Sequence, residues 1–84
     1  MNYYSQLRRK VESQVRKAKD MPEWLAAGVS RHMDRAEYFR EAPDAKSAEQ
    51  RSLSYQRAMH ELWCAHDWLH IYIYRDMPER WNFK

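Results

Sequence analysis

His60, Cys64 and Asp67 are the side chains whose types and spacing are most typical of a chemical site. They stand at i, i+4 and i+7, so a helix presents all three on one side. Imidazole, thiolate and carboxylate groups all bind zinc, but a closed structural site needs four converging ligands. The sequence has no Cys-x-x-Cys pair, and His66 and His70 fall on another side of the same helix. We therefore predict no metal and no cofactor, with His60, Cys64 and Asp67 as the candidates if a metal site exists.

The pair formed by His60 and Cys64 also suggests nucleophilic catalysis, in which an imidazole activates a thiol. Such an enzyme needs donors that stabilise an oxyanion and a cleft that holds the substrate. One glycine in 84 residues leaves few loops from which to build either. The stretch HELWCAH is not a zinc-protease motif, because its histidines are six residues apart rather than four. We therefore predict no catalytic residues and no enzymatic activity.

Positive charge is concentrated at the start of the chain. Residues 1–20 hold six lysines and arginines against two acidic residues, whereas the other 64 residues hold nine against ten. On a helix these bases lie away from the apolar side, where they can meet phosphates or an acidic protein surface. Tyr3 and Tyr4 are available to stack on nucleic-acid bases. The residues predicted to bind nucleic acid or an acidic partner are Arg8, Arg9, Lys10, Arg16 and Lys17.

Aromatic side chains are more numerous than one small core requires, with four tryptophans, six tyrosines and two phenylalanines. Trp, Tyr, Met and Arg are also the residues that anchor protein interfaces. At about 100° per residue, Trp63 and Trp68 fall on opposite flanks of a helix, and Ile71 and Tyr74 fall behind its core-facing side. We expect at least two of these four to be exposed in an isolated chain. The residues predicted to bind a protein are Trp63, Trp68, Ile71, Tyr74 and Trp81.

Apolar spacing predicts three helices that position these side chains, at about residues 3–19, 22–41 and 47–74, followed by a short C-terminal turn. The residues expected to face the core are Tyr4, Leu7, Val11, Val15 and Ala18 in the first helix, Trp24, Leu25, Val29, Met33, Ala36 and Tyr38 or Phe39 in the second, and Ala58, Leu62, Ala65 and Leu69 in the third. The third helix is apolar almost all round, so we expect it to be central or to meet a partner.

Local signals mark where the helices begin. The tetrapeptide DMPE occurs at residues 20–23 and again at 76–79, and we interpret it as one local device used twice. Asp20 is expected to cap the second helix, with Pro22 in its first turn. Ser47 and Gln50 form a capping box for the third. Gly28 lies inside the second helix, where glycine costs about 1 kcal/mol relative to alanine, so we expect a neighbouring helix to approach it closely.

The bulk composition limits the fold class. One glycine and 32% charged residues favour an all-α chain, a small three-helix bundle forming one domain over residues 1–84. HIYIY alternates like a strand, but no second strand candidate is available to pair with it. No long apolar run or signal peptide is present, so we expect no membrane partner, and the lone cysteine is typical of a cytoplasmic protein.

Together these features predict a non-enzymatic protein-binding module. We expect a small regulator or inhibitor that occupies a surface of a larger protein or complex, as the inhibitors that phages and mobile elements direct at host machinery do. Two alternatives stay open: a basic protein that binds nucleic acid through its first helix, and a homodimeric structural or adaptor protein.

Overall fold

The computed structural model describes residues 2–75. These residues form three helices, α1 (Tyr3–Lys17), α2 (Glu23–Glu41) and α3 (Ala48–Tyr74). No strand occurs in this range, and HIYIY is the last part of α3. The prediction of a small all-α three-helix bundle is therefore confirmed. The second DMPE, Trp81 and the predicted C-terminal turn lie outside the described residues.

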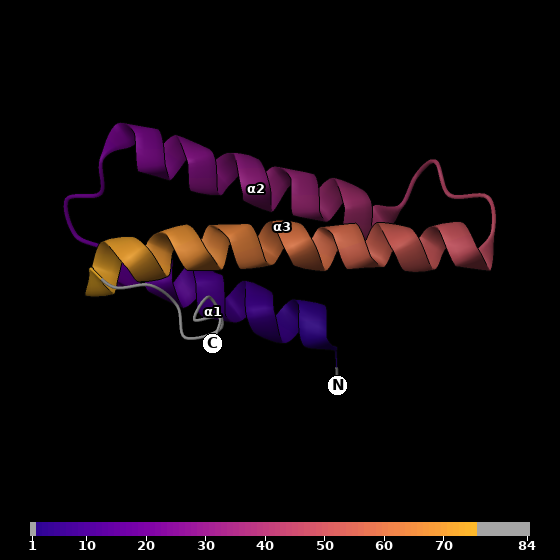
Figure 1. Ribbon diagram of the computed structural model, residues 1–84, viewed down its shortest axis with the longest axis horizontal. Coiled ribbons are helices and arrows are strands. Elements are labelled where there is room, and N and C mark those ends of the chain that lie inside the picture. Colours follow the sequence, from indigo (N-terminus) through magenta and orange to yellow (C-terminus); the bar gives the residue numbers. More distant parts are fainter. Residues whose placement is uncertain (1, 76–84) are drawn as a thin grey trace, which may run out of the picture.

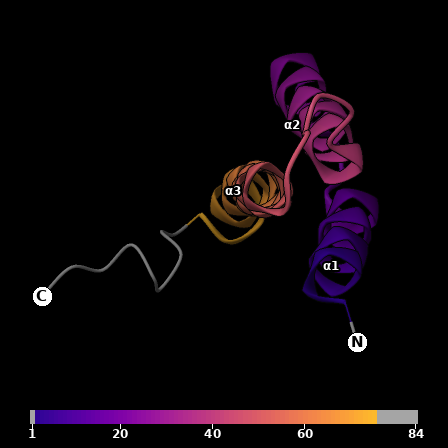
Figure 2. The ribbon, with the colours of Figure 1, turned by 90° about the vertical axis from the view of Figure 1, so that its right-hand side faces the viewer.

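The long helix α3 is the centre of the arrangement. The chain runs up, down and up, so α2 is antiparallel to both of its neighbours in sequence (Figure 1). Viewed end-on, α1 and α2 both lie on one side of α3, and neither of them covers its opposite side (Figure 2). A helix that contacts two others needs apolar residues on more than one flank, but these contacts do not account for Trp68 and Tyr74, which stay exposed.

The core consists of two adjoining groups, each built from all three helices. Residues of the first group are Tyr4, Leu7, Ala36, Ala58 and Leu62. Residues of the second group are Val11, Leu25, Val29, Ala65 and Leu69. The predicted α3 stripe is fully buried, and small side chains at Ala58 and Ala65 let α1 and α2 approach α3. Burying each large apolar side chain contributes about 1.5–3 kcal/mol, so this stripe determines how the helices pack.

Two of the three helix starts follow from side-chain caps. The Asn2 side chain accepts a hydrogen bond of 2.9 Å from the backbone N–H of Tyr4, at the start of α1. Ser47 accepts one of 3.1 Å from the N–H of Gln50, as predicted. The Gln50 side chain in turn accepts from the N–H of Lys46, one residue earlier than in the standard box.

The predicted cap of α2 is wrong. The N-cap residue is Pro22, which makes no side-chain cap, and Asp20 lies in the turn before it with a left-handed backbone (φ 55°). Asp20 therefore shapes the turn between α1 and α2 rather than capping the helix. The turn is held by Tyr72, whose hydroxyl donates to the carbonyl oxygens of Lys19 (3.1 Å) and Asp20 (2.9 Å).

Three residues predicted to face the core are exposed: Val15, Trp24 and Tyr38. The expectation for Gly28 is also wrong, since a Cβ built at this position meets no atom within 4 Å. Gly28 thus borders open space rather than a closely packed helix. On α2 the buried stripe is Leu25, Val29 and Ala36, which is narrower than the apolar composition suggests and leaves Trp24, Gly28 and Tyr38 outside it.

Polar side chains join α1 to α2 across the outer edge of the bundle. The buried Tyr4 donates its hydroxyl proton to Oε2 of Glu37 at 2.9 Å, and Nη1 of Arg8 lies 3.3 Å from the same oxygen. Burial, then the hydrogen bond to Glu37, raises the pKa of Tyr4 above its usual value. None of the helices described is at once long enough and apolar enough to cross a membrane.

Candidate functional site

An open groove lies between α2 and α3, at the end of the bundle where α2 begins. Trp24 of α2 is 67% exposed and Trp68 of α3 is 49% exposed, although both are large and apolar. The two indole rings line one hollow of 540 Å³ and a second of 150 Å³. The other residues that line the larger hollow are Pro22, Leu25, Ile71, Tyr72 and Arg75. We call this surface the Trp24–Trp68 groove.

Gly28 explains why the groove stays open. It lines the smaller hollow together with Trp24, Val29 and Trp68, and it carries no side chain that could fill the space. One end of the groove is basic and aromatic, because the guanidinium of Arg75 lies 4.9 Å from the centre of the Tyr72 ring. Such a cation–π contact holds the charge over an apolar surface. The groove therefore presents two tryptophans and one cation.

The predicted protein-binding residues divide between two surfaces. Trp68 and Ile71 lie in the groove. Trp63 and Tyr74 lie on the other flank of α3, in a row of rings with His66 and His70 between them. Tyr74 is 56% exposed, whereas Trp63 is half-buried against the core. The expectation that at least two of the four are exposed is met by Trp68 and Tyr74, and Trp81 lies outside the described residues.

The basic residues of α1 differ in their availability. Arg9, Lys10, Arg16 and Lys17 are exposed. Arg8 is half-buried and pairs with Glu37 (3.3 Å) and with Glu12 (3.9 Å), so its charge joins helices instead of facing a partner. Tyr4 is buried and cannot stack on a base, while Tyr3 is 75% exposed. The predicted basic surface is therefore smaller than its sequence suggests.

The candidate metal residues are only partly brought together. His60 Nε2 lies 3.6 Å from Cys64 Sγ, as their i, i+4 spacing predicts. Asp67 is buried, and its Oδ1 lies 3.1 Å from Nδ1 of the adjacent His66. Neither His60 nor Asp67 belongs to the group of potential metal ligands that forms around Cys64.

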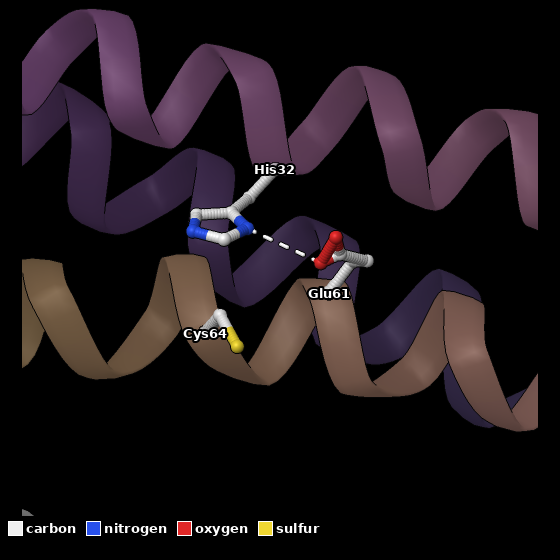
Figure 3. A group of neighbouring side chains, drawn as sticks. All are labelled: His32, Glu61 and Cys64. Carbon is white, nitrogen blue, oxygen red and sulfur yellow. Dashed lines mark hydrogen bonds and ion pairs between the residues drawn. The ribbon is translucent and has the colours of Figure 1, made fainter.

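That group joins two helices. His32 of α2 and Glu61 and Cys64 of α3 place their ligand atoms within 4.8 Å of one another (Figure 3). His32 Nδ1 lies 3.2 Å from Glu61 Oε2. Glu61 Oε1 accepts a 2.7 Å hydrogen bond from Arg35 Nε, so the buried carboxylate has an opposite charge beside it.

The sequence alone missed Trp24, Gly28, His32 and Glu61. Trp24 was assigned to the core because its position fits the apolar stripe of α2. His32 and Glu61 are 29 residues apart, and only the register between α2 and α3 brings them together. One signal for a shared surface was available in the sequence. Trp24 and His32 are eight residues apart, two steps of four, which places them about 12 Å apart along one side of a helix.

Comparison with protein-family models, with curated proteins and with solved structures finds no match to this chain.

Proposed function

We propose that the protein is a non-enzymatic binding module, a small regulator or inhibitor, that docks a helix of a larger protein into the Trp24–Trp68 groove. The observation that carries the proposal is the pair of exposed tryptophans on facing helices, with the hollow of 540 Å³ between them. Tryptophan is the residue most enriched at energetically dominant interface positions. Soluble monomers rarely leave such rings together in water without a partner.

The shape of the groove favours a helix as the occupant. It follows the side of α2 from Trp24 to His32, which is about 12 Å or two helical turns. An amphipathic helix can place apolar anchors at i, i+3 or i+4, and i+7 along such a length. Arg75 at one end favours an acidic residue beside those anchors. The partner is therefore an amphipathic helix with an acidic residue beside its apolar anchors.

The test compares two double variants. Trp24→Ala with Trp68→Ala removes both rings of the groove, whereas Tyr3→Ala with Tyr38→Ala removes two equally exposed aromatic residues elsewhere. Tagged wild-type chain is used to capture proteins from cells that produce it, in parallel with and without nuclease, and the dissociation constant of each captured protein is measured. Loss of an anchor costs 2 kcal/mol or more, so the tryptophan variant should bind at least about thirtyfold more weakly, and the tyrosine variant should bind normally.

Other outcomes would overturn the proposal. Equal binding by both double variants would place the contact elsewhere. Concentration-dependent dimerisation that is lost only in the tryptophan variant would make the groove a contact between two copies of this chain. A complex that disappears with nuclease and with added salt would favour the second candidate, nucleic-acid binding.

That second candidate rests on the exposed charges of α1. Arg9, Lys10, Arg16 and Lys17 are the cations that remain available there. Changing these four residues to glutamate should remove phosphate-driven binding and leave groove-driven binding intact. The two candidates are therefore distinguishable in one set of measurements.

A further inference from the structure

Four potential metal ligands surround one hollow at the interface of α2 and α3. They are His32 from α2 and His60, Glu61 and Cys64 from α3, and we call them the donor cluster. All four line the same hollow of 380 Å³. The ligand atoms of His32, Glu61 and Cys64 lie within 4.8 Å of one another, and His60 Nε2 lies 3.6 Å from Cys64 Sγ. His60 lies outside that three-residue group and joins it through Cys64, which gives the four donors that a structural zinc site requires.

The distances between donor atoms fit a tetrahedral ion. With the usual bond lengths to zinc, a tetrahedron separates a nitrogen and a sulfur ligand by about 3.6 Å, and a nitrogen and an oxygen ligand by about 3.3 Å. The observed separations are 3.6 Å for His60 and Cys64 and 3.2 Å for His32 and Glu61. Two edges of the tetrahedron therefore already have nearly the required length, and the ligand atoms of His32, Glu61 and Cys64 have to close from separations of up to 4.8 Å.

The surroundings of Glu61 orient its carboxylate for this role. Arg35 holds Oε1 at 2.7 Å, which leaves Oε2 directed toward His32 and Cys64 (Figure 3). Metal-bound carboxylates are commonly fixed by a hydrogen bond to their other oxygen. The Glu61 side chain is only 7% exposed, so it reaches the metal without first having to be ordered.

We propose that His32, His60, Glu61 and Cys64 bind one zinc ion that joins α2 to α3. The Cys64 thiol loses its proton to solvent on binding, so thiolate and carboxylate together balance the two positive charges of the ion. The mixture of sulfur, nitrogen and oxygen ligands selects zinc over magnesium and calcium, which prefer oxygen alone. His32 also lines the smaller hollow of the Trp24–Trp68 groove, but zinc binding is measured on the isolated chain and does not depend on a partner helix.

The test uses the full chain after treatment with a chelator. Zinc is titrated by calorimetry and by competition with a metal indicator, and cobalt is titrated as a spectroscopic substitute. We expect one equivalent of zinc to bind and to raise the melting temperature, because the ion binds only the folded arrangement of two helices. Cobalt should give a tetrahedral visible spectrum and a thiolate-to-metal charge-transfer band.

Three single variants and a control assign the ligands. Cys64→Ala should abolish the charge-transfer band, and Cys64→Ala and His32→Gln should each weaken zinc binding by more than about 100-fold, since even residues behind the ligands change affinity by about 10–100-fold. His60→Gln should weaken it at least about tenfold. His70→Gln changes a histidine of the same helix that is not part of the cluster, and it should bind zinc normally.

Each contrary result overturns the assignment. The wild-type chain binding no zinc at micromolar concentrations would remove the site. Unchanged zinc affinity in Cys64→Ala or His32→Gln would show adventitious binding by other surface groups. His60 is exposed, so His60→Gln leaves the core intact, and unchanged affinity in that variant would refute the four-residue site even if another variant failed to fold.

Discussion

Arg35 and Glu61 join α2 to α3 through an ion pair in which Nε of Arg35 lies 2.7 Å from Oε1 of Glu61. The two partners differ in their surroundings, because the Arg35 side chain is 61% exposed and that of Glu61 only 7%. The carboxylate is therefore the group that depends on the pair. An ionised carboxylate buried without a partner is costly, whereas an exposed guanidinium loses little when its partner is removed.

Arg35→Gln should therefore reduce the free energy of unfolding by roughly 1.5–3 kcal/mol, the usual value of a hydrogen bond to a charged group. The matched control is Arg31→Gln, which changes an exposed arginine of the same helix and should alter stability by less than about 0.5 kcal/mol. Urea unfolding followed by circular dichroism measures both variants without added metal. Equal stabilities of the two variants would show that the buried carboxylate does not rely on Arg35.

The sequence predicted the fold because the α3 stripe is a local pattern. Ala58, Leu62, Ala65 and Leu69 share one side of a helix whatever they pack against, and all four are fully buried. The candidate site could not be predicted as completely, because His32 meets Glu61 only through the register of two antiparallel helices. That register is set by the turn lengths and by the packing of the whole core. Spacing along one helix predicted that His60 and Cys64 lie close together, whereas Asp67 lies outside the group of ligand atoms around Cys64.

Asp20 provides a test of how the turn before α2 is formed. Its backbone is left-handed, so a β-branched residue there should strain the chain by about 1–2 kcal/mol. Asp20→Thr should therefore destabilise the protein by this amount, whereas Asp20→Gly should be neutral or stabilising. Threonine is a good N-cap, so an N-cap role for residue 20 predicts that Asp20→Thr is harmless. Thermal unfolding of the two variants distinguishes these mechanisms.

Tyr4 should make the stability of the bundle fall at alkaline pH. Its pKa is raised in the folded chain above the ordinary value of 10.0, by burial and by the hydrogen bond to Glu37. The folded state then holds the phenol proton more tightly than the unfolded state. This contribution is complete below pH 10.0 and is lost as pH rises through the raised pKa, at no more than about 1.4 kcal/mol per pH unit.

Tyr4→Phe should cost about 0.5–1.5 kcal/mol at neutral pH, because it removes the hydrogen bond to Glu37, and it should show a shallower loss of stability above pH 10.0. Tyr3→Phe changes the exposed neighbour and should follow the wild-type profile. Unfolding free energies measured across the alkaline range give both slopes. A Tyr4→Phe profile parallel to that of the wild type would show that Tyr4 is not responsible.

Gly28 separates the stability of α2 from the binding proposed for its surface. A glycine inside a helix costs about 1 kcal/mol relative to alanine, and the space beside Gly28 is open, with no atom within 4 Å of a built Cβ. Gly28→Ala should therefore stabilise the protein by up to about 1 kcal/mol without filling the groove. Gly28→Met is also a good helix former, but its long side chain extends into the hollow of 150 Å³ between Trp24 and Trp68. We expect both variants to melt above the wild type, while only Gly28→Met loses the partner helix. If Gly28→Met bound that partner normally, the groove beside Gly28 would not be the docking site, because the methionine side chain occupies the space that the partner helix would need.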